Sequence, residues 1–224
     1  MFRQRAFPVL ASALMAILSG CVGAPEAARR APRMATSWTP PAAPEGRVCL
    51  LNLGRSDANF TPLPDQYYGA GCSAVGAVRL AALRSDEGLL QLTNLGPVTC
   101  PLANTLSGWA RFGVDRAAQQ ILGSKLVRIE TMGSYSCRNV AGTSRLSGHA
   151  TANAVDVSGF VLADGRRITV ARDWYGGGPQ VRAFLDTVRG SACKRFGTVL
   201  SPDYNTAHHD HFHLEVGAAR PFCS

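Results

Sequence analysis

The five histidines of this 224-residue chain are confined to two short segments. His149 lies in the first, residues 147–156, and the other four lie in the second, residues 208–213. Imidazole nitrogen and carboxylate oxygen are common zinc ligands, and a catalytic zinc ion takes three protein ligands and leaves a fourth position for water. His149, Asp156 and one or two of the later histidines could form such a set. The leading prediction is therefore a metal-assisted hydrolase.

The second histidine segment runs into a predicted strand over residues 211–216. Side chains of a strand alternate between its two faces, so His211, His213 and Glu215 share one face. The residues between them are apolar and share the other face. Two histidines that project the same way from a stiff strand can contact one ion or one substrate.

The elements that must position these residues are predicted to be short strands and a few helices, which indicates an α+β class. Asp164 and Gly165 predict a hairpin turn. Asp115 is expected to cap a helix that ends at Gly123, and Trp109 and Ile121 are assigned to the core. Strands are predicted at 77–83, 89–93, 125–130, 154–157, 167–170, 197–200 and 211–216, and helices at 102–110, 115–123 and 180–188.

The first twenty residues predict a signal peptide. Arg3 and Arg5 form a positive start, and the apolar segment 6–17 is too short to span a bilayer comfortably. The run Leu-Ser-Gly-Cys that ends at Cys21 resembles the lipobox of bacterial lipoproteins, in which the cysteine is acylated. The alternative is an ordinary secretory signal with a chance cysteine. We expect a periplasm-facing lipoprotein of the cell envelope, anchored by its lipid in the outer membrane.

Residues 21–46 are rich in alanine and proline and predict an extended tether, with a reach on the order of 75 Å. The folded domain is expected at 47–224, a length that suits one sizeable domain. Removal of the first twenty residues deletes two arginines and no acids, which lowers the formal net charge from +8 to 8 − 2 = +6. This moderately basic charge suits an anionic partner such as cell wall or lipid headgroups. No long basic run or interleaved aromatic stripe is present, so a nucleic-acid partner is not expected.

Six cysteines follow Cys21, and an even number in an exported protein predicts three disulfides. Fifteen pairings are possible, and the sequence does not distinguish them. No two cysteines form a C-x-x-C pair, which argues against thiolate zinc sites and thioredoxin-like redox chemistry. The six are Cys49, Cys72, Cys100, Cys137, Cys193 and Cys223.

Three resemblances follow from these motifs. The pattern S-x-H-x6-D at 147–156, followed by H-x-H at 211–213, resembles the LAS group of zinc peptidases, named for lysostaphin, D-Ala-D-Ala metallopeptidases and the hedgehog amino-terminal domain. With His208 added, the second motif resembles penicillin-insensitive murein endopeptidases. More narrowly, the six cysteines, the run YSCR at 135–138 and the run DHFHL at 210–214 resemble the bacterial extensin-like C-terminal domain family.

The LAS resemblance implies a zinc peptidase fold in which a small antiparallel sheet with flanking helices carries the metal. It implies His149, Asp156 and His213 as the zinc ligands. The sequence departs from the group at Ala152, where the group has glycine. If that position requires a positive φ, alanine costs stability there.

The resemblance also implies catalytic roles beside the metal. His211 would be the base or orienting group, and His208 a further polar group at the transition state. Arg138 matches the arginine that stabilises the polarised carbonyl in related carboxypeptidases; the alternative is a structural ion pair. Ser147 more plausibly supports the ligand loop than acts as a nucleophile, because no G-x-S-x-G elbow is present. His209 receives no role.

Three functions stay open at this point. The first is hydrolysis of peptidoglycan stem peptides or crosslinks with Zn²⁺, with D,D or L,D and endopeptidase or carboxypeptidase specificity undecided. The second is a non-catalytic zinc-containing protein that binds the cell wall. The third is a disulfide-bonded envelope lipoprotein whose metal serves stability alone. Three ligands in the spacing of the LAS group favour an open, catalytic site.

Overall fold

The computed structural model describes residues 44–217 and 220–224. The predicted signal peptide, Cys21 and nearly all of the predicted tether lie outside these described residues. Helix α1 begins at Pro44, three residues before the predicted start of the domain. Among the helices that the structure describes, none has the length and apolar character needed to cross a bilayer.

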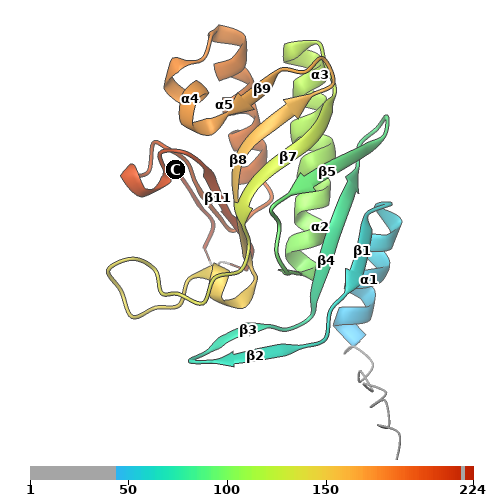
Figure 1. Cartoon of the computed structure of the whole chain (residues 1–224), viewed down its shortest axis with the longest axis vertical. Helices are drawn as coiled ribbons and strands as arrows, with labels where there is room; N and C mark the ends of the chain where they lie inside the picture. The colour runs from blue at the N-terminus through green and yellow to red at the C-terminus, as the bar shows by residue number, and fades with distance from the viewer. Residues whose placement is uncertain (1–43, 218–219) are drawn as a thin grey trace, which may run out of the picture. The chain divides into compact units, whose positions relative to one another are not determined.

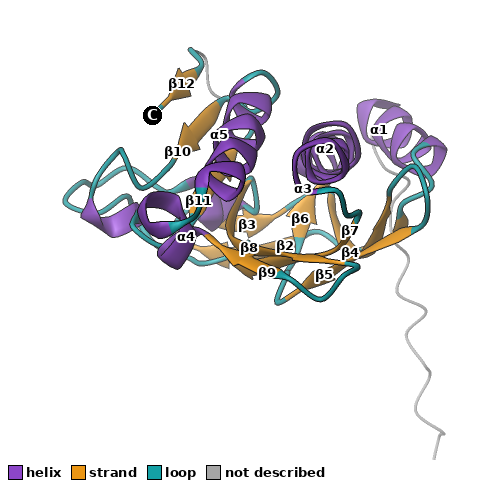
Figure 2. Ribbon diagram, turned by 90° about the horizontal axis from the view of Figure 1, so that it is seen from above, coloured by secondary structure: helices purple, strands orange, loops and turns teal. Residues whose placement is uncertain are grey.

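One large mixed β-sheet forms the framework (Figures 1 and 2). Two short strands pair beside its main path, β6 (Val98–Thr99) with β4 and β9 (Arg167–Thr169) with β8. A separate hairpin consists of β2 (Gln66–Gly69) and β3 (Cys72–Ala74). The main path runs in the order β1 (Asn59–Pro62), β4 (Ala77–Arg84), β5 (Leu89–Thr93), β7 (Leu126–Gly133), β8 (Ala154–Leu162), β11 (Phe212–Glu215), β10 (Thr198–Leu200) and β12 (Phe222–Cys223).

The α+β class is confirmed, but the expectation of a small antiparallel sheet is wrong. The sheet contains ten strands within the described residues. Its strand pairs are antiparallel except for β5 with β7 and β10 with β12, which are parallel. A parallel neighbour requires a crossover connection, and the helical segment between β5 and β7 supplies it.

Helices lie along one face of the sheet, where Figure 2 shows α1, α2, α3 and α5 together. A π-helical turn, η1, joins α2 to α3 without a break, and 3₁₀ turns η2 and η3 precede β8 and β11. The bounds are α1 (Pro44–Arg55), α2 (Cys100–Trp109), η1 (Ala110–Asp115), α3 (Arg116–Leu122), η2 (Gly148–Thr151), α4 (Val170–Gly176), α5 (Pro179–Cys193) and η3 (Thr206–His208).

Asp115 does not cap α3 as predicted, because the helical backbone continues through it. The side chain is fully buried instead. It accepts hydrogen bonds from the backbone N–H of Leu126 at 2.9 Å and from the amide of Gln119 at 2.8 Å. Asp115 thus ties the helix to the start of β7. The C-terminal end of α3 follows the prediction, because Gly123 ends the helix in the left-handed conformation.

The core lies between the helices and the sheet and is centred on Trp109. This side chain is fully buried, and its indole N–H donates to the carbonyl of Val188 at 3.1 Å. Its ring meets Phe160 of β8 and Phe196 at centroid distances of 6.2 and 6.0 Å. Ile121 is partly buried against the same core. The assignment of Trp109 and Ile121 to packing is confirmed.

Three disulfides join the six predicted cysteines. Cys49–Cys100 links α1 to α2, and Cys193–Cys223 links α5 to the last strand. Cys72–Cys137 links the β2–β3 hairpin to the loop that follows β7. That loop carries Arg138, so this disulfide holds a predicted catalytic residue to the body of the domain.

The double substitution Cys72→Ser/Cys137→Ser is expected to lower the free energy of unfolding by about 2–5 kcal/mol. The reason is the loop closed by this bond, which spans a sequence separation of 65 residues. Urea unfolding followed by circular dichroism measures the change. Ser136→Ala, an exposed neighbour, is the control and should change the free energy by less than about 0.5 kcal/mol. An unchanged unfolding midpoint in the double variant would contradict the prediction.

Candidate metal centre

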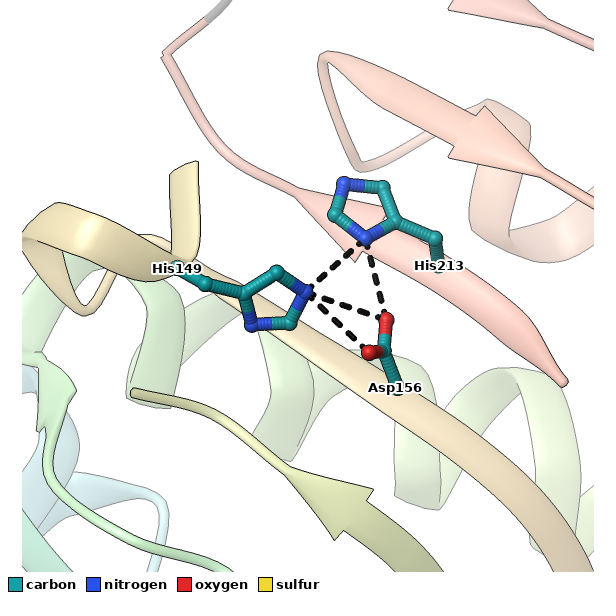
Figure 3. Close-up of side chains that lie close together, drawn as sticks. All are labelled: His149, Asp156 and His213. Atoms are coloured by element: carbon teal, nitrogen blue, oxygen red, sulfur yellow. Dashed lines mark hydrogen bonds and ion pairs between the residues drawn. The ribbon is translucent and has the colours of Figure 1, made fainter. Parts of the chain in front are cut away.

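The side chains of His149, Asp156 and His213 converge on one point (Figure 3). The Nε2 atom of His149 lies 3.1 Å from Nδ1 of His213 and 3.2 Å from both carboxylate oxygens of Asp156. Nδ1 of His213 lies 3.0 Å from Oδ1 of Asp156. The structure therefore brings together the three residues that the sequence predicted as metal ligands.

The register of two strands places Asp156 and His213. Asp156 of β8 and His213 of β11 are direct partners in an antiparallel pair, and such partners have Cβ atoms about 4.5–5.5 Å apart. Phe212 and Leu214 are fully buried in the core. Because side chains alternate along a strand, His213 projects from the opposite face of the sheet, as predicted.

The turn η2 places His149, and Ala152 closes this turn. Ala152 has φ 55° and ψ 24°, and its carbonyl accepts a hydrogen bond from the N–H of Thr99 at 2.9 Å. The position therefore does require a positive φ, which costs alanine about 1–2 kcal/mol. The methyl group of Ala152 is fully buried against Ala74 and Ala77. This burial stabilises the fold by about 0.8 kcal/mol. Burial offsets part of the backbone strain.

In His149 and His213, the ring nitrogen that points away from Asp156 lies close to an oxygen. Nδ1 of His149 lies 3.0 Å from the carbonyl of Ser134, and Nε2 of His213 lies 3.3 Å from the carboxylate of Glu215. Both oxygens can only accept, so in the neutral rings these outer nitrogens carry the protons. The inner nitrogens then present lone pairs to one another and to Asp156. Metal-bound histidines commonly have this arrangement.

The three converging atoms fit a zinc ion. Two imidazole lone pairs and a carboxylate oxygen all accept, so their close approach requires a cation or a proton between them. Zinc bonds of about 2.0–2.2 Å in tetrahedral geometry place neighbouring ligand atoms about 3.3–3.6 Å apart. The separations of 3.0–3.2 Å need only a slight expansion.

The pKa shifts of Asp156 and His213 are consistent with a positive charge between these groups. Burial alone raises the pKa of Asp156, but hydrogen bonds with His149 and His213 outweigh it and hold the pKa well below its usual range. Burial lowers the pKa of His213, whereas its contacts with Asp156 and Glu215 raise it, with a net pKa of about 9. Without a metal ion, a proton on His213 therefore balances the partly buried carboxylate of Asp156.

His211 and His208 lie beside this cluster. Nδ1 of His211 bonds Oδ1 of Asp210 at 2.8 Å, and Nε2 lies 3.6 Å from Oδ1 of Asp156. The ring of His208 lies 5.2 Å from that of His211, and its Nδ1 contacts Asn205 at 2.7 Å. Burial, together with the nearby imidazoles of His211 and His213, lowers the pKa of His208 to about 4. His208 is therefore neutral at pH 7.

A cavity of about 380 Å³ opens beside the cluster. Its walls include the predicted residues Arg138, Ser147, Asp156, His208, His211 and His213. His209 is exposed and does not line it; its Nδ1 contacts the carbonyl of Thr206 at 2.9 Å. Tyr204 and Phe222, whose rings meet at 5.7 Å, form an aromatic part of the wall.

Three groups that orient the histidines had no predicted role. Asp210 directly precedes His211, and Glu215 was expected on the ligand face, so both had a signal in the sequence. The carbonyl of Ser134 had none, because any residue can supply a backbone oxygen.

The fold and the site together define a disulfide-bonded α+β domain with a His/Asp cluster at the wall of a cavity. Residues 47–224 match the family described as Extensin-like protein C-terminus, and the chain belongs to this family. No curated protein matches the chain, and no solved structure does. The family predicted from the cysteines and the short motifs is therefore confirmed.

Replacing a ligand histidine should remove the metal. Wild-type protein loaded with zinc is expected to hold one equivalent, and His213→Ala to hold almost none, because three ligands would be reduced to two. His209→Ala is the matched control and should retain the full equivalent. Elemental analysis after gel filtration measures the content. Equal losses in the two variants would show that the assignment of His213 is wrong.

Glu215→Ala should weaken zinc binding by about 10- to 100-fold, because His213 loses the carboxylate that orients it. Gly148→Ala tests the same contact, since an added Cβ would lie 2.5 Å from the Glu215 carboxyl carbon and displace it. Gly190→Ala, with open space at its Cβ, is the control. Competition with a chromophoric chelator gives the affinities. Wild-type affinity in both site variants would exclude a role for Glu215.

Proposed function

We propose that this chain is a zinc peptidase that hydrolyses peptide bonds in the stem peptides or crosslinks of peptidoglycan during cell-wall remodelling. The observation that carries the proposal is the convergence of His149, Asp156 and His213 beside a cavity that is also lined by a third histidine, His211, which Asp210 orients. We also propose that the domain is related to the LAS group, on the strength of the spacing of these residues.

A catalytic role for the metal is favoured over a purely structural one. His149, Asp156 and His213 would hold the ion, and structural zinc sites usually close with four protein ligands. Asp156 and His213 line the cavity, so substrate can approach them. A bound zinc ion supplies Lewis-acid chemistry, which polarises a carbonyl group and makes water more acidic.

His211 is the proposed proton-transfer group. Asp210 accepts the hydrogen bond from Nδ1–H, which leaves the lone pair of Nε2 directed toward the cluster. This nitrogen accepts a proton from the attacking water as the new C–O bond forms. It then donates that proton to the leaving nitrogen as the peptide C–N bond breaks. Asp210 keeps the ring in the orientation that both transfers require.

Arg138 and His208 act on the other side of the reacting carbonyl in this proposal. Both line the cavity. The guanidinium of Arg138 meets the negative charge that develops on the carbonyl oxygen. His208, which is neutral at pH 7, adds a polar contact without adding a second positive charge.

The substrate and the compartment are proposed from the sequence as well. The residue spacing shared with murein peptidases favours peptidoglycan, and the basic net charge suits an anionic wall. The lipobox-like run favours acylation at Cys21 and a lipid anchor in the envelope. The tether at 21–46 would then let a periplasm-facing domain reach the wall from the outer membrane.

His211→Ala should retain zinc and fold but lose activity by about 100- to 10,000-fold, because it removes the proton-transfer group and leaves the ligands in place. Arg138→Ala should lower the activity by about 100- to 1,000-fold, because no guanidinium would stabilise the charge that develops on the carbonyl oxygen. His209→Ala should keep full activity. Digestion of purified cell walls, with released fragments identified by mass spectrometry, measures these rates.

The wild type itself provides the decisive outcome. If zinc-loaded protein releases no fragments from walls of several crosslink types, the peptidase proposal fails. Co-sedimentation with the same walls would then support the non-catalytic wall-binding function in its place.

A further inference from the structure

The loop between β7 and η2 forms a small hairpin at the cavity. Asn139 and Leu146 make an antiparallel bridge, and the N–H of Val140 donates to the carbonyl of Arg145 at 2.8 Å. We call residues 138–147 the arginine hairpin. Figure 1 shows this yellow loop on the same side of the molecule as the red segment before β11, and both segments line the cavity.

The register of the arginine hairpin decides which side chains face the cavity. Side chains alternate between the two faces of such a pair. Leu146 points away from the cavity toward the β2–β3 hairpin, where a Cβ on Gly71 would lie 2.7 Å from its Cδ1. The residues of the other face all line the cavity: Arg138, Val140, Arg145 and Ser147.

Within residues 44–217 and 220–224, the guanidinium groups of Arg138 and Arg145 form no ion pair and no hydrogen bond; Arg145 bonds the Thr143 hydroxyl only through its backbone N–H. Arg166, by contrast, pairs with a nearby aspartate. The two carboxylates that line the cavity, Asp156 and Glu215, are already bonded to histidines. The arginine hairpin therefore presents two guanidinium groups to the cavity with no described carboxylate to pair with them.

The size of the cavity limits what these arginines can bind. A volume of 380 Å³ corresponds to a sphere about 9 Å across, and one residue of extended chain advances about 3.5 Å. The cavity therefore holds two or three residues of a peptide. Arg138 is placed at the reacting carbonyl, which leaves Arg145 for a second negative group within one or two residues of the cleaved bond.

We propose that Arg145 is a specificity residue that binds a free carboxylate of the substrate, which directs the enzyme to acidic peptides. The inference rests on the proposed peptidase function and names its substrate class. A guanidinium matches a carboxylate through two parallel hydrogen bonds. The carboxylate comes either from the end of the peptide or from an acidic side chain close to the cleaved bond.

The test compares three forms of one stem peptide with zinc-loaded, full-length protein. The first form has all its carboxylates free, the second has a carboxamide at its C-terminus, and the third has its acidic side chain amidated. Wild-type protein should lose about 10- to 100-fold in kcat/KM on one of the amidated forms, mainly through a higher KM. The form that suffers this loss identifies the source of the carboxylate.

The variants assign the effect to Arg145. Arg145→Gln should show the same loss on the free peptide, with kcat and zinc content nearly unchanged, and no further loss on the sensitive amide. The kcat/KM of Arg145→Lys on the free peptide should lie between those of the wild type and Arg145→Gln, because lysine keeps the charge without the paired hydrogen bonds. Arg182→Gln, at an exposed position of α5, is the matched control and should behave as wild type.

Two outcomes would overturn the inference while the peptidase proposal stands: Arg145→Gln keeps the wild-type preference, or it slows all three peptides equally. If the wild type cleaves no peptide, the peptidase proposal fails, and calorimetric titration with the same peptides decides the inference separately. Tighter binding of the free peptide, reduced in Arg145→Gln, supports it. Equal affinities in both proteins refute it.

Discussion

The site depends on the antiparallel pairing of β8 with β11, which sets Asp156 opposite His213. The register of this pair is fixed on the other face of the sheet, where apolar side chains of both strands are fully buried in the core. A slip of one residue would expose those side chains and bury the polar ones. Hydrophobic packing under the helices therefore sets the spacing of the polar cluster above the sheet.

The partly buried carboxylate of Asp156, beside two imidazoles, then imposes a second constraint, because its negative charge requires a positive partner. The surrounding residues favour a metal ion in that role. The Ser134 carbonyl and the Glu215 carboxylate accept hydrogen bonds from the outer ring N–H groups of His149 and His213. The absence of a side chain at Gly148 leaves space for the Glu215 carboxylate. The strand pair, the turn η2 and the loop after β7 thus all supply or orient groups of the cluster formed by His149, Asp156 and His213.

Much of this arrangement could be predicted from local patterns. The alternation of residues 211–215 predicted the shared face of His211, His213 and Glu215, and the even cysteine count predicted three disulfides. Long-range features could not be predicted in this way. The parallel pairing of β5 with β7 depends on a crossover through the helices, and the role of Asp115 depends on Leu126, which a later strand brings beside it. The disulfide pairing likewise depends on the tertiary fold.

In the proposed role of Arg145, the disulfide Cys72–Cys137 bears on ligand binding as well as on stability. The arginine hairpin is held to the β2–β3 hairpin by this bond and by the contact of Leu146 with Gly71. A loop fixed at both points loses little conformational freedom when a ligand binds, so more of the interaction energy appears as affinity. A stabilising bond alone would not require two guanidinium groups with no partner among the described residues to line the cavity. Their placement on a restrained wall beside the histidine cluster is better explained by the binding of an anionic ligand than by stability.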